Sequence, residues 1–223
     1  MGEAAHDLDQ LIADIRAEAY ETRHATGSAA FDERVLTALR DVPREEFVAD
    51  ALRHQAYANH PLPIGRGQTI SQPFIVALMT DLIEPCPDSI VLEIGAGSGY
   101  QAAVLSRLVK RVHTLEIIEE LAHEAAQRLQ RLGYANVEVG TGNGWLGWPE
   151  HAPYDAILVA AAARSVPEAL VAQLRPGGTL VVPVGMPHEA QELMVVRKDE
   201  DGRVERRAVL PVAFVPMVAP MMA

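Results

Sequence analysis

Short apolar runs alternate with helix-like stretches between residues 90 and 185, and this alternation restricts the fold more than any other feature of the chain. The apolar runs lie at 90–95, 111–117, 137–142, 154–162 and 179–185. Helical patterns separate most of them, at 100–109, 119–133 and 167–175. Nearly unbroken apolar strands are typical of parallel sheets that are covered on both faces. The sequence therefore predicts an α/β fold with a doubly wound, mostly parallel sheet.

The two ends of the chain follow other patterns. Helical periodicity at 5–24 and 30–41 predicts an N-terminal helical addition. Residues 44–72 are rich in proline and glycine and are interpreted as a long ordered loop before a helix that begins near Pro73. Two strand-like stretches meet at an Asp-Gly turn within 192–210, so an antiparallel hairpin is expected to finish the sheet.

A glycine run, VLEIGAGSGY, follows the first strand of the alternating region. Ligands of doubly wound sheets bind at the carboxyl ends of strands, where Gly95, Gly97 and Gly99 would let backbone approach a ligand. The dinucleotide fingerprint GxGxxG requires a glycine where Tyr100 stands, which weakens an NAD or FAD interpretation. The pattern GxxxxGK[ST] is absent, so a P-loop is excluded. A tight turn without a ligand is the alternative.

Three polar residues at strand ends restrict which ligand the glycine run can be expected to bind. Glu116 ends the second strand, where an acidic residue can accept hydrogen bonds from ribose hydroxyls. The ligand is therefore expected to contain a ribose but needs no pyrophosphate, and S-adenosyl-L-methionine fits this description. Glu93 could contact the cationic tail of that molecule. Asn143 follows the third strand and could hydrogen-bond the adenine edge. Alternatively, Glu116 caps the acidic start of the next helix.

Composition limits the possible partners and compartment. The formal net charge is −11, whereas nucleic-acid binders are usually basic, so no nucleic-acid partner is expected. No window approaches 18 uninterrupted apolar residues, so no membrane partner is expected either. Cys86 is the single cysteine, and the N-terminus lacks a secretory pattern, which favours a cytoplasmic location. The eight histidines show no HxxxH or HExxH spacing, so no metal site is expected.

Beyond the glycine run, the sequence resembles the protein-L-isoaspartate (D-aspartate) O-methyltransferase family. The stretches that carry the resemblance run in order along nearly the whole chain. They are VPREEFV at 42–48, GQTISQPFIVALMTDLI at 67–83, VLEIGAGSGYQAAVLS at 91–106, GWPEHAPYDAILVAAAA at 147–163 and LVAQLRPGGTLVVPVG at 170–185. The TIS motif at 69–71 and the APYDAI motif at 152–157 are the most specific to the family.

The resemblance implies a Rossmann-like class I methyltransferase and a reaction. A methyl group passes from S-adenosyl-L-methionine to the free α-carboxylate of an L-isoaspartyl residue, which starts repair through a succinimide and leaves S-adenosyl-L-homocysteine. Isoaspartyl proteins and peptides are then the partners, and the enzyme is expected to be a monomer. Ser71 matches the family's active-site hydroxyl, with Thr69 in support. Ile117 and Gly144, beside Glu116 and Asn143, are expected to contact the cofactor.

Two positions depart from the family pattern. Asn143 stands in GNG where the family commonly has Asp in GDG, and Ala160 stands where it commonly has Thr or Gly. The hydroxyls of Thr69 and Ser71 could instead cap the helix that begins at Pro73. Methylation of another carboxylate, such as an Asp side chain in a dedicated peptide, and a cofactor-binding module without transfer activity are the competing functions.

The whole chain, 1–223, is expected to form a single methyltransferase domain. Residues 1–85 would supply the helical N-terminal portion and the acceptor-side loop. Residues 86–223 would supply the cofactor-binding sheet and the C-terminal hairpin. This division follows the change of pattern near residue 90, which no flexible linker marks.

Overall fold

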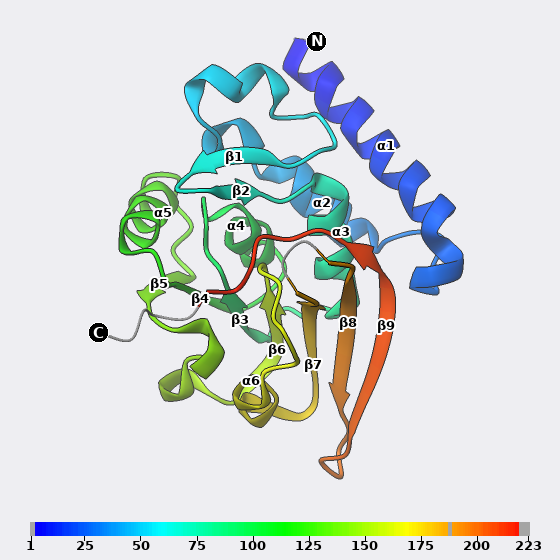
Figure 1. The fold of residues 1–223 in the computed structure, drawn as a ribbon. Coiled ribbons are helices and arrows are strands. Elements are labelled where there is room, and N and C mark those ends of the chain that lie inside the picture. The colour runs from blue at the N-terminus through cyan, green and yellow to red at the C-terminus, as the bar shows by residue number, and fades with distance from the viewer. Residues whose placement is uncertain (1–2, 187–188, 219–223) are drawn as a thin grey trace.

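A seven-stranded sheet forms the centre of the protein (Figure 1). The computed structural model describes residues 3–186 and 189–218. The strands are β3 (Ile90–Ile94), β4 (Arg111–Glu116), β5 (Val137–Thr141), β6 (Tyr154–Val159), β7 (Leu174–Val184), β8 (Gln191–Lys198) and β9 (Val204–Val212). Their order in the sheet is β5-β4-β3-β6-β7-β8-β9. The pairs from β5 to β7 are parallel, whereas β8 and β9 pair antiparallel, which confirms the predicted sheet and its C-terminal hairpin.

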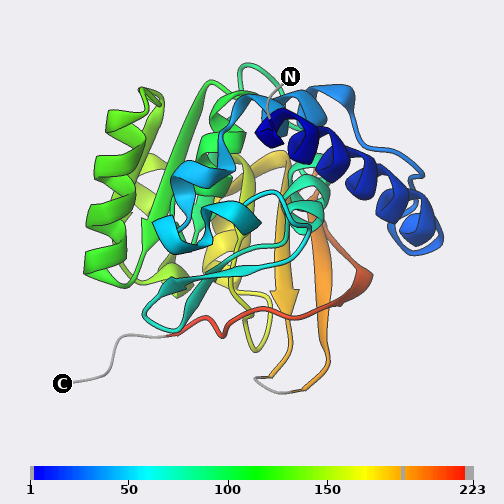
Figure 2. The same cartoon turned by 90° about the horizontal axis from the view of Figure 1, so that it is seen from above.

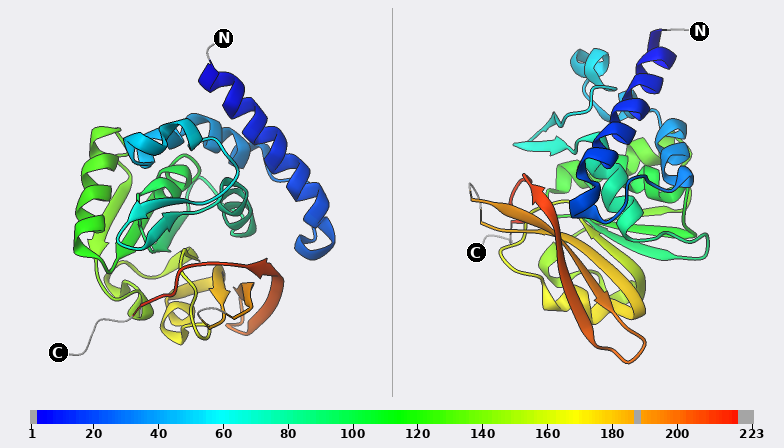
Figure 3. Two further views of the ribbon diagram at one scale, coloured as in Figure 1. Left: turned by 45° about the horizontal axis from the view of Figure 1, so that its top comes forward. Right: turned by 90° about the vertical axis from the view of Figure 1, so that its right-hand side faces the viewer.

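Helices cover the two faces of the sheet unequally. They are α1 (Glu3–Thr26), α2 (Glu33–Asp41), α3 (Pro73–Leu82), α4 (Tyr100–Ser106), α5 (Glu119–Arg131) and α6 (Glu168–Gln173). Buried side chains of α1 to α5 form one apolar cluster with one face of the sheet. A smaller cluster joins α6 to the other face, where Trp145 and Trp148 pack. Figure 2 shows α5 near one end of the molecule and α1 near the other. Figure 3 shows that the β8–β9 hairpin extends beyond the helices.

The segment 44–72 is more regular than the predicted loop. It contains two 3-10 helices, η1 (Arg44–Phe47) and η2 (Asp50–Gln55), and a hairpin of β1 (Leu62–Gly65) and β2 (Gln68–Ile70). Gly65, Arg66 and Gly67 all have positive φ, as a tight hairpin turn requires. The loop prediction was wrong here because the two strands are very short and one contains Pro63, which hides the strand pattern.

The strand order reverses next to β3, and this reversal positions the candidate site. β3 lies between β4 and β6: the chain runs from β3 to β4 and β5 on one side, and then crosses to β6 on the other side of β3. A crevice at such a point is where open α/β sheets bind ligands. Among the described residues, no helix is both long and apolar enough to cross a membrane.

Candidate functional site

The glycine run forms the turn between β3 and α4. Gly95, Gly97 and Gly99 have φ of 94°, 52° and 87°, a left-handed backbone that glycine adopts without strain. The Gly95 N–H donates to the Leu115 carbonyl at 2.8 Å, which ties the turn to β4. A Cβ at Gly97 would lie 3.2 Å from Ile64 Cδ1, so the β1–β2 hairpin packs directly on the turn. Gly95 and Gly97 line a pocket at the carboxyl ends of the strands, whereas Gly99 does not line it and packs against Leu129 of α5.

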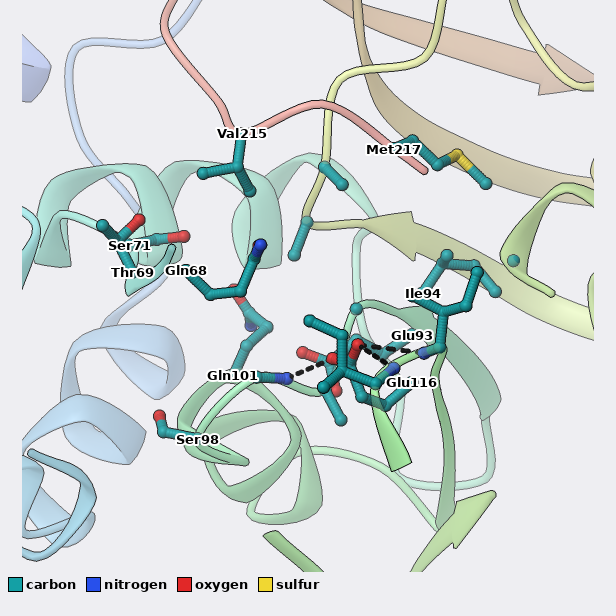
Figure 4. Close-up of a pocket in the computed structure, with 18 of the residues that line it drawn as sticks. Gln68, Thr69, Ser71, Glu93, Ile94, Ser98, Gln101, Glu116, Val215 and Met217 are labelled. Carbon is teal, nitrogen blue, oxygen red and sulfur yellow. Dashed lines mark hydrogen bonds between the residues drawn. The ribbon is translucent and has the colours of Figure 1, made fainter. Parts of the chain in front are cut away.

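Glu116 reaches into this pocket from the end of β4 (Figure 4). One carboxylate oxygen accepts the Gly97 N–H at 2.9 Å, and the other accepts the N–H groups of Ile117 and Ile118 at 2.9 and 3.0 Å. The N-cap residue of α5 is Ile118, so Glu116 is not the side-chain cap of that helix. The carboxylate instead holds the glycine turn against β4, and its role toward a ribose stays a prediction.

Glu93 is the most unusual charged group of the pocket. Its side chain is fully buried on β3, and neither carboxylate oxygen makes a hydrogen bond within the described chain. Burial raises the pKa of Glu93 to about 8. An isolated carboxylate in such a place is costly unless a cation or hydrogen-bond donor meets it. Because Glu93 also lines the pocket, this missing partner fits a cationic group of a bound ligand.

Asn143 and Gly144 meet the pocket in different ways. The Asn143 side-chain oxygen accepts the Trp145 N–H at 3.1 Å and caps the 3-10 helix η3 (Gly144–Leu146). Gly144 lines the pocket, but Asn143 is not among the residues that line it. A Cβ at Gly144 would lie 2.3 Å from Ile94 Cγ2, so only glycine fits there. The expected contact of Asn143 with adenine stays a prediction. Its side-chain oxygen is used in the cap, so the amide nitrogen is the group that would make this contact.

Thr69 and Ser71 lie on the other side of the pocket from Glu93 and Glu116 (Figure 4). The alternative that they cap α3 is wrong: the N-cap residue is Gln72, and the Asn59 side chain accepts the Phe74 N–H at 3.0 Å. The buried Arg44 guanidinium donates to the Ser71 carbonyl at 2.8 Å. The backbone of Ser71 is therefore fixed, while its hydroxyl makes no hydrogen bond with the described residues.

A second groove begins where Thr69 and Ser71 lie. It runs between the start of α3 and the chain that follows β9, and it shares Thr69, Ser71, Ala160 and Val215 with the first pocket. Glu18 of α1 also lines it and accepts hydrogen bonds from Asn59 and Gln72. The two cavities therefore adjoin at Ser71, one next to the glycine turn and the other between the start of α3 and the chain that follows β9.

Sequence reasoning missed the segment after β9, which covers the first pocket. Val215, Pro216, Met217 and Val218 line it, and two backbone hydrogen bonds of 2.8 Å join Val215 and Met217 to Ala162. Gln68 and Gln101 were also missed. Short polar motifs or glycines marked the predicted residues, whereas this segment is apolar and comes close only through the folding of the sheet. Its local sequence therefore carried no signal of a binding role.

The chain was also compared with known proteins. The sequence model of the family described as Protein-L-isoaspartate(D-aspartate) O-methyltransferase matches residues 20–221. A relative named Protein-L-isoaspartate O-methyltransferase 2 from Polaromonas sp. is 56% identical over 207 residues, which are 93% of this chain and 98% of the relative. A protein of the same name from Syntrophobacter fumaroxidans is 54% identical over 208 residues, covering 93% and 84%. The chain belongs to this methyltransferase family.

Solved structures agree with the family assignment. A structure named protein-L-isoaspartate O-methyltransferase is 29% identical with a TM-score of 0.78, over 90% of this chain and 65% of that one. A putative protein-L-isoaspartate O-methyltransferase from Plasmodium falciparum, solved in complex with S-adenosyl-L-homocysteine, is 22% identical with a TM-score of 0.76, over 94% and 97%. The second likeness shows the shared fold.

The two family motifs have different places in the structure. The TIS motif lines the pocket, whereas the APYDAI motif forms the start of β6. There the Tyr154 hydroxyl donates to the Trp148 carbonyl at 2.6 Å, and Asp155 accepts the Ile90 N–H at 2.6 Å. This methyltransferase motif therefore holds the sheet together rather than contacting a ligand. Ala160, the departure from the family pattern, does lie where the two cavities meet.

Proposed function

We propose that the protein transfers a methyl group from S-adenosyl-L-methionine to the free α-carboxylate of L-isoaspartyl residues in damaged proteins and peptides. The family assignment supports the reaction. The observation that carries it in this structure is the meeting of two cavities at Ser71. A methyl transfer needs two ligands side by side, and a pocket that opens into a surface groove provides adjoining sites for a small donor and a peptide acceptor.

The residues of the first pocket fit S-adenosyl-L-methionine. The buried Glu93 carboxylate has no partner in the described chain and suits a cationic amine. The glycine turn lets backbone come close to a ligand, and Glu116 has acceptor capacity left for a ribose hydroxyl. When bound, this cofactor supplies a methyl group that its sulfonium already activates.

The acceptor side needs little chemistry from the protein. A carboxyl group in water has a pKa of roughly 4 and is ionised near neutral pH, so no general base is required. The Ser71 hydroxyl would donate a hydrogen bond to one acceptor oxygen and orient the other toward the cofactor pocket. Arg44 keeps Ser71 in place through its carbonyl. The apolar cover at 215–218 would keep water from the reacting atoms.

Labelled methyl transfer tests the proposal. The protein would be incubated with labelled S-adenosyl-L-methionine and paired peptides that differ only in isoaspartate or aspartate at one position. We expect label on the isoaspartyl peptide alone. Label on the aspartyl peptide would favour a different carboxylate as the acceptor. Cofactor binding without label on either peptide would favour a binding module and contradict the proposal.

Ser71→Ala tests the assigned hydroxyl. We expect turnover of the isoaspartyl peptide to fall about ten- to hundredfold, while cofactor affinity changes less than threefold, because a hydrogen bond to a charged group contributes about 1.5–3 kcal/mol. Ser165→Ala is the matched control, since Ser165 is exposed and lies outside both cavities. Equal turnover of the two variants would show that Ser71 is not a catalytic residue.

The proposal also covers the organisation of the chain. One cluster of buried apolar residues joins Leu11 of α1 to Val209 of β9 and includes residues of the helices and of the sheet. That continuity supports a single methyltransferase domain in which the N-terminal part supplies the acceptor side and the sheet supplies the cofactor side. Damaged proteins and peptides are the proposed partners.

A further inference from the structure

Two histidines and a glutamate meet on the face of the sheet opposite to Glu93. His113 lies on β4 and Glu138 on the paired position of β5, while His151 lies in the 3-10 helix η4 (Pro149–His151). Alternation along β4 places His113 on the same face as Leu115, whereas Thr114, the pairing partner of Glu93, points to the other face. None of the three lines the cofactor pocket or the acceptor groove.

Their ligand atoms lie close together. His113 Nδ1 is 3.3 Å from one Glu138 oxygen, and His151 Nε2 is 3.7 Å from the other. One ligand atom from each residue can be chosen so that all three lie within 4.8 Å of one another. In a tetrahedral zinc site, bond lengths of about 2.0–2.1 Å put ligand atoms roughly 3.3 Å apart. The His113 and His151 rings are stacked with an interplanar angle of 19°, so the His151 ring would have to turn before both nitrogens could face one ion. His151 and Glu138 are both partly exposed, which leaves them room to move.

His113 carries the second, independent observation. The residue is 3% exposed, and its Nδ1 has no hydrogen-bond partner among residues 3–186 and 189–218. A buried ring nitrogen without a partner is uncommon, because its desolvation is not compensated. This nitrogen lies 3.3 Å from a Glu138 carboxylate oxygen without the alignment of a hydrogen bond, and the His113 and His151 rings are stacked with their centroids 4.1 Å apart. The nitrogen therefore lacks an in-line partner next to both of the other side chains.

We propose that His113, Glu138 and His151 form a binding site for a divalent transition metal, with Zn²⁺ as the best match. Imidazole nitrogens favour zinc and its neighbours in the first transition row, whereas Mg²⁺ and Ca²⁺ favour oxygen ligands. Two histidines and one carboxylate leave a position for water in a four-coordinate site. Glu138 and His151 are 44% and 30% exposed, so an ion can reach the site from solvent.

Spacing along the chain could not reveal this site. The three residues come from two strands and a later loop, and pairing of β4 with β5 brings two of them together. The Tyr154 hydroxyl and the Trp148 ring hold the third nearby. Tyr154 donates to the Trp148 carbonyl, and the Trp148 ring centroid lies 4.6 Å from that of His151 and 5.7 Å from that of His113. The prediction of no metal site therefore rested on local motifs alone.

The position of the metal site indicates a structural role and not a catalytic one. Trp148 also packs against Gly140 of β5, where an added Cβ would lie 2.5 Å from its ring. A bound ion would link β4 and β5 to the loop that begins at Asn143 and Gly144, beside the cofactor pocket. Its expected effects are therefore on stability and on the order of this loop, and methyl transfer itself does not need the ion.

Cobalt absorption and zinc calorimetry test the proposal on untagged, metal-free full-length protein. All samples carry Cys86→Ser, which removes an exposed free thiol as a competing ligand for these ions. We expect one Zn²⁺ per chain, a visible Co²⁺ absorption band that Zn²⁺ abolishes, and a rise in thermal midpoint with Zn²⁺. Both His151→Ala and Glu138→Gln should weaken binding at least about tenfold. His54→Ala, which removes an exposed histidine elsewhere, should not.

Quenching of Trp148 fluorescence by Co²⁺ in a Trp145→Phe background gives a local readout, because Trp148 contacts both histidines. Circular dichroism would establish that each variant is folded, and Glu138→Gln keeps the size of the side chain. Absence of a bound ion at 100-fold molar excess of Zn²⁺ would overturn the proposal. Binding that His151→Ala and Glu138→Gln leave unchanged would overturn it as well, by placing the ion elsewhere.

Discussion

The two sides of the cofactor pocket are built in different ways. The side with Glu93 and Glu116 comes from one continuous stretch, 93–118, in which β3, the glycine turn, α4 and β4 follow one another. The side with Thr69 and Ser71 combines the β1–β2 hairpin with the segment 215–218, which lies far along the chain. The cofactor side therefore depends on local geometry, whereas the acceptor side depends on packing between distant segments. Substitutions should separate the two.

Gly144→Ala acts where the two sides meet and should have the largest effect. The added Cβ would lie 2.3 Å from Ile94 Cγ2 and 3.0 Å from Met217 Cε. We expect cofactor binding to be lost at concentrations that saturate the unchanged protein, and the free energy of unfolding to fall by about 1–3 kcal/mol from overpacking. Calorimetry and denaturant titration would measure the two effects.

Gly142→Ala is the matched control, because the atoms nearest to its Cβ belong to the end of the Leu115 side chain, at 3.1 Å and beyond, which can move. Equal behaviour of the two alanine variants would contradict the close packing at Gly144.

Glu93→Gln should damage the cofactor side alone. Replacing a buried carboxylate that faces a cationic ligand removes a charge-assisted interaction, so we expect cofactor affinity at pH 8 to fall about ten- to hundredfold. The peptide KM at saturating cofactor should change less than threefold. Isothermal calorimetry and initial rates would separate these values, and an equal loss in both would show that the two sides are not independent.

The raised pKa of Glu93 also predicts a pH dependence. Below about 8 the empty site holds a protonated Glu93, which must lose its proton to meet a cation. Cofactor affinity should therefore weaken as pH falls below 8, by up to about tenfold per unit. Without cofactor, Glu93 keeps its proton in the folded state up to about pH 8, whereas in the unfolded state it loses the proton above its ordinary pKa. Between these two pKa values, the free energy of unfolding should therefore decrease as pH rises. Glu93→Gln should remove both dependences, as titration calorimetry and thermal melts at several pH values would show.

Gln191→Ala should loosen the acceptor side. The buried Gln191 amide donates to the Phe214 carbonyl at 3.1 Å and accepts the Phe214 N–H at 2.7 Å, which fixes the start of the covering segment. We expect the peptide KM to rise about three- to tenfold, with cofactor affinity within about threefold. Gln191→Glu keeps an oxygen that accepts the Phe214 N–H, so its peptide KM should lie between those of the unchanged protein and of Gln191→Ala. A larger loss of cofactor affinity than of peptide binding would reverse the assignment of this segment.

Asn143→Asp should have the smallest effect, and in the opposite direction. Aspartate caps η3 as well as asparagine does, so stability should change little. The second carboxylate oxygen could accept the adenine amino group, which the Asn143 amide nitrogen cannot do. We expect cofactor affinity to rise about two- to fivefold, as one added hydrogen bond gives. Unchanged affinity would show that this side chain does not face the adenine.

The same contrast explains what could be predicted from the sequence. The strand and helix alternation, the glycine turn and the strand-end carboxylates depend on neighbours along the chain, and the pattern predicted their positions. The β1–β2 hairpin was interpreted as a loop, because strands of three or four residues give too little periodicity. The cover at 215–218 could not be predicted, since its contacts with Ala162 depend on the complete sheet.

For the site residues, the sequence likewise indicated which groups are candidates but not their surroundings. The environment of Glu93 could not be foreseen, because a sequence does not show that both carboxylate oxygens are buried without partners. The capping alternative for Ser71 was equally consistent with the sequence, and it is excluded by the start of α3 after Gln72 and by the Asn59 hydrogen bond to Phe74. Residue type and position thus indicate candidate groups, and the packing around them decides their state.

Arg44 gives the acceptor side an electrostatic character that differs from the rest of the molecule. Within the described chain no carboxylate lies within 4.0 Å of its guanidinium, which rests over the Tyr100 ring at 4.8 Å. The whole protein carries −11, a field that attracts a cationic donor and repels an anionic acceptor. A buried cation behind Ser71 is poorly screened by salt, unlike the surface charges. Raising the ionic strength should therefore slow association of the cofactor and speed association of an acidic peptide.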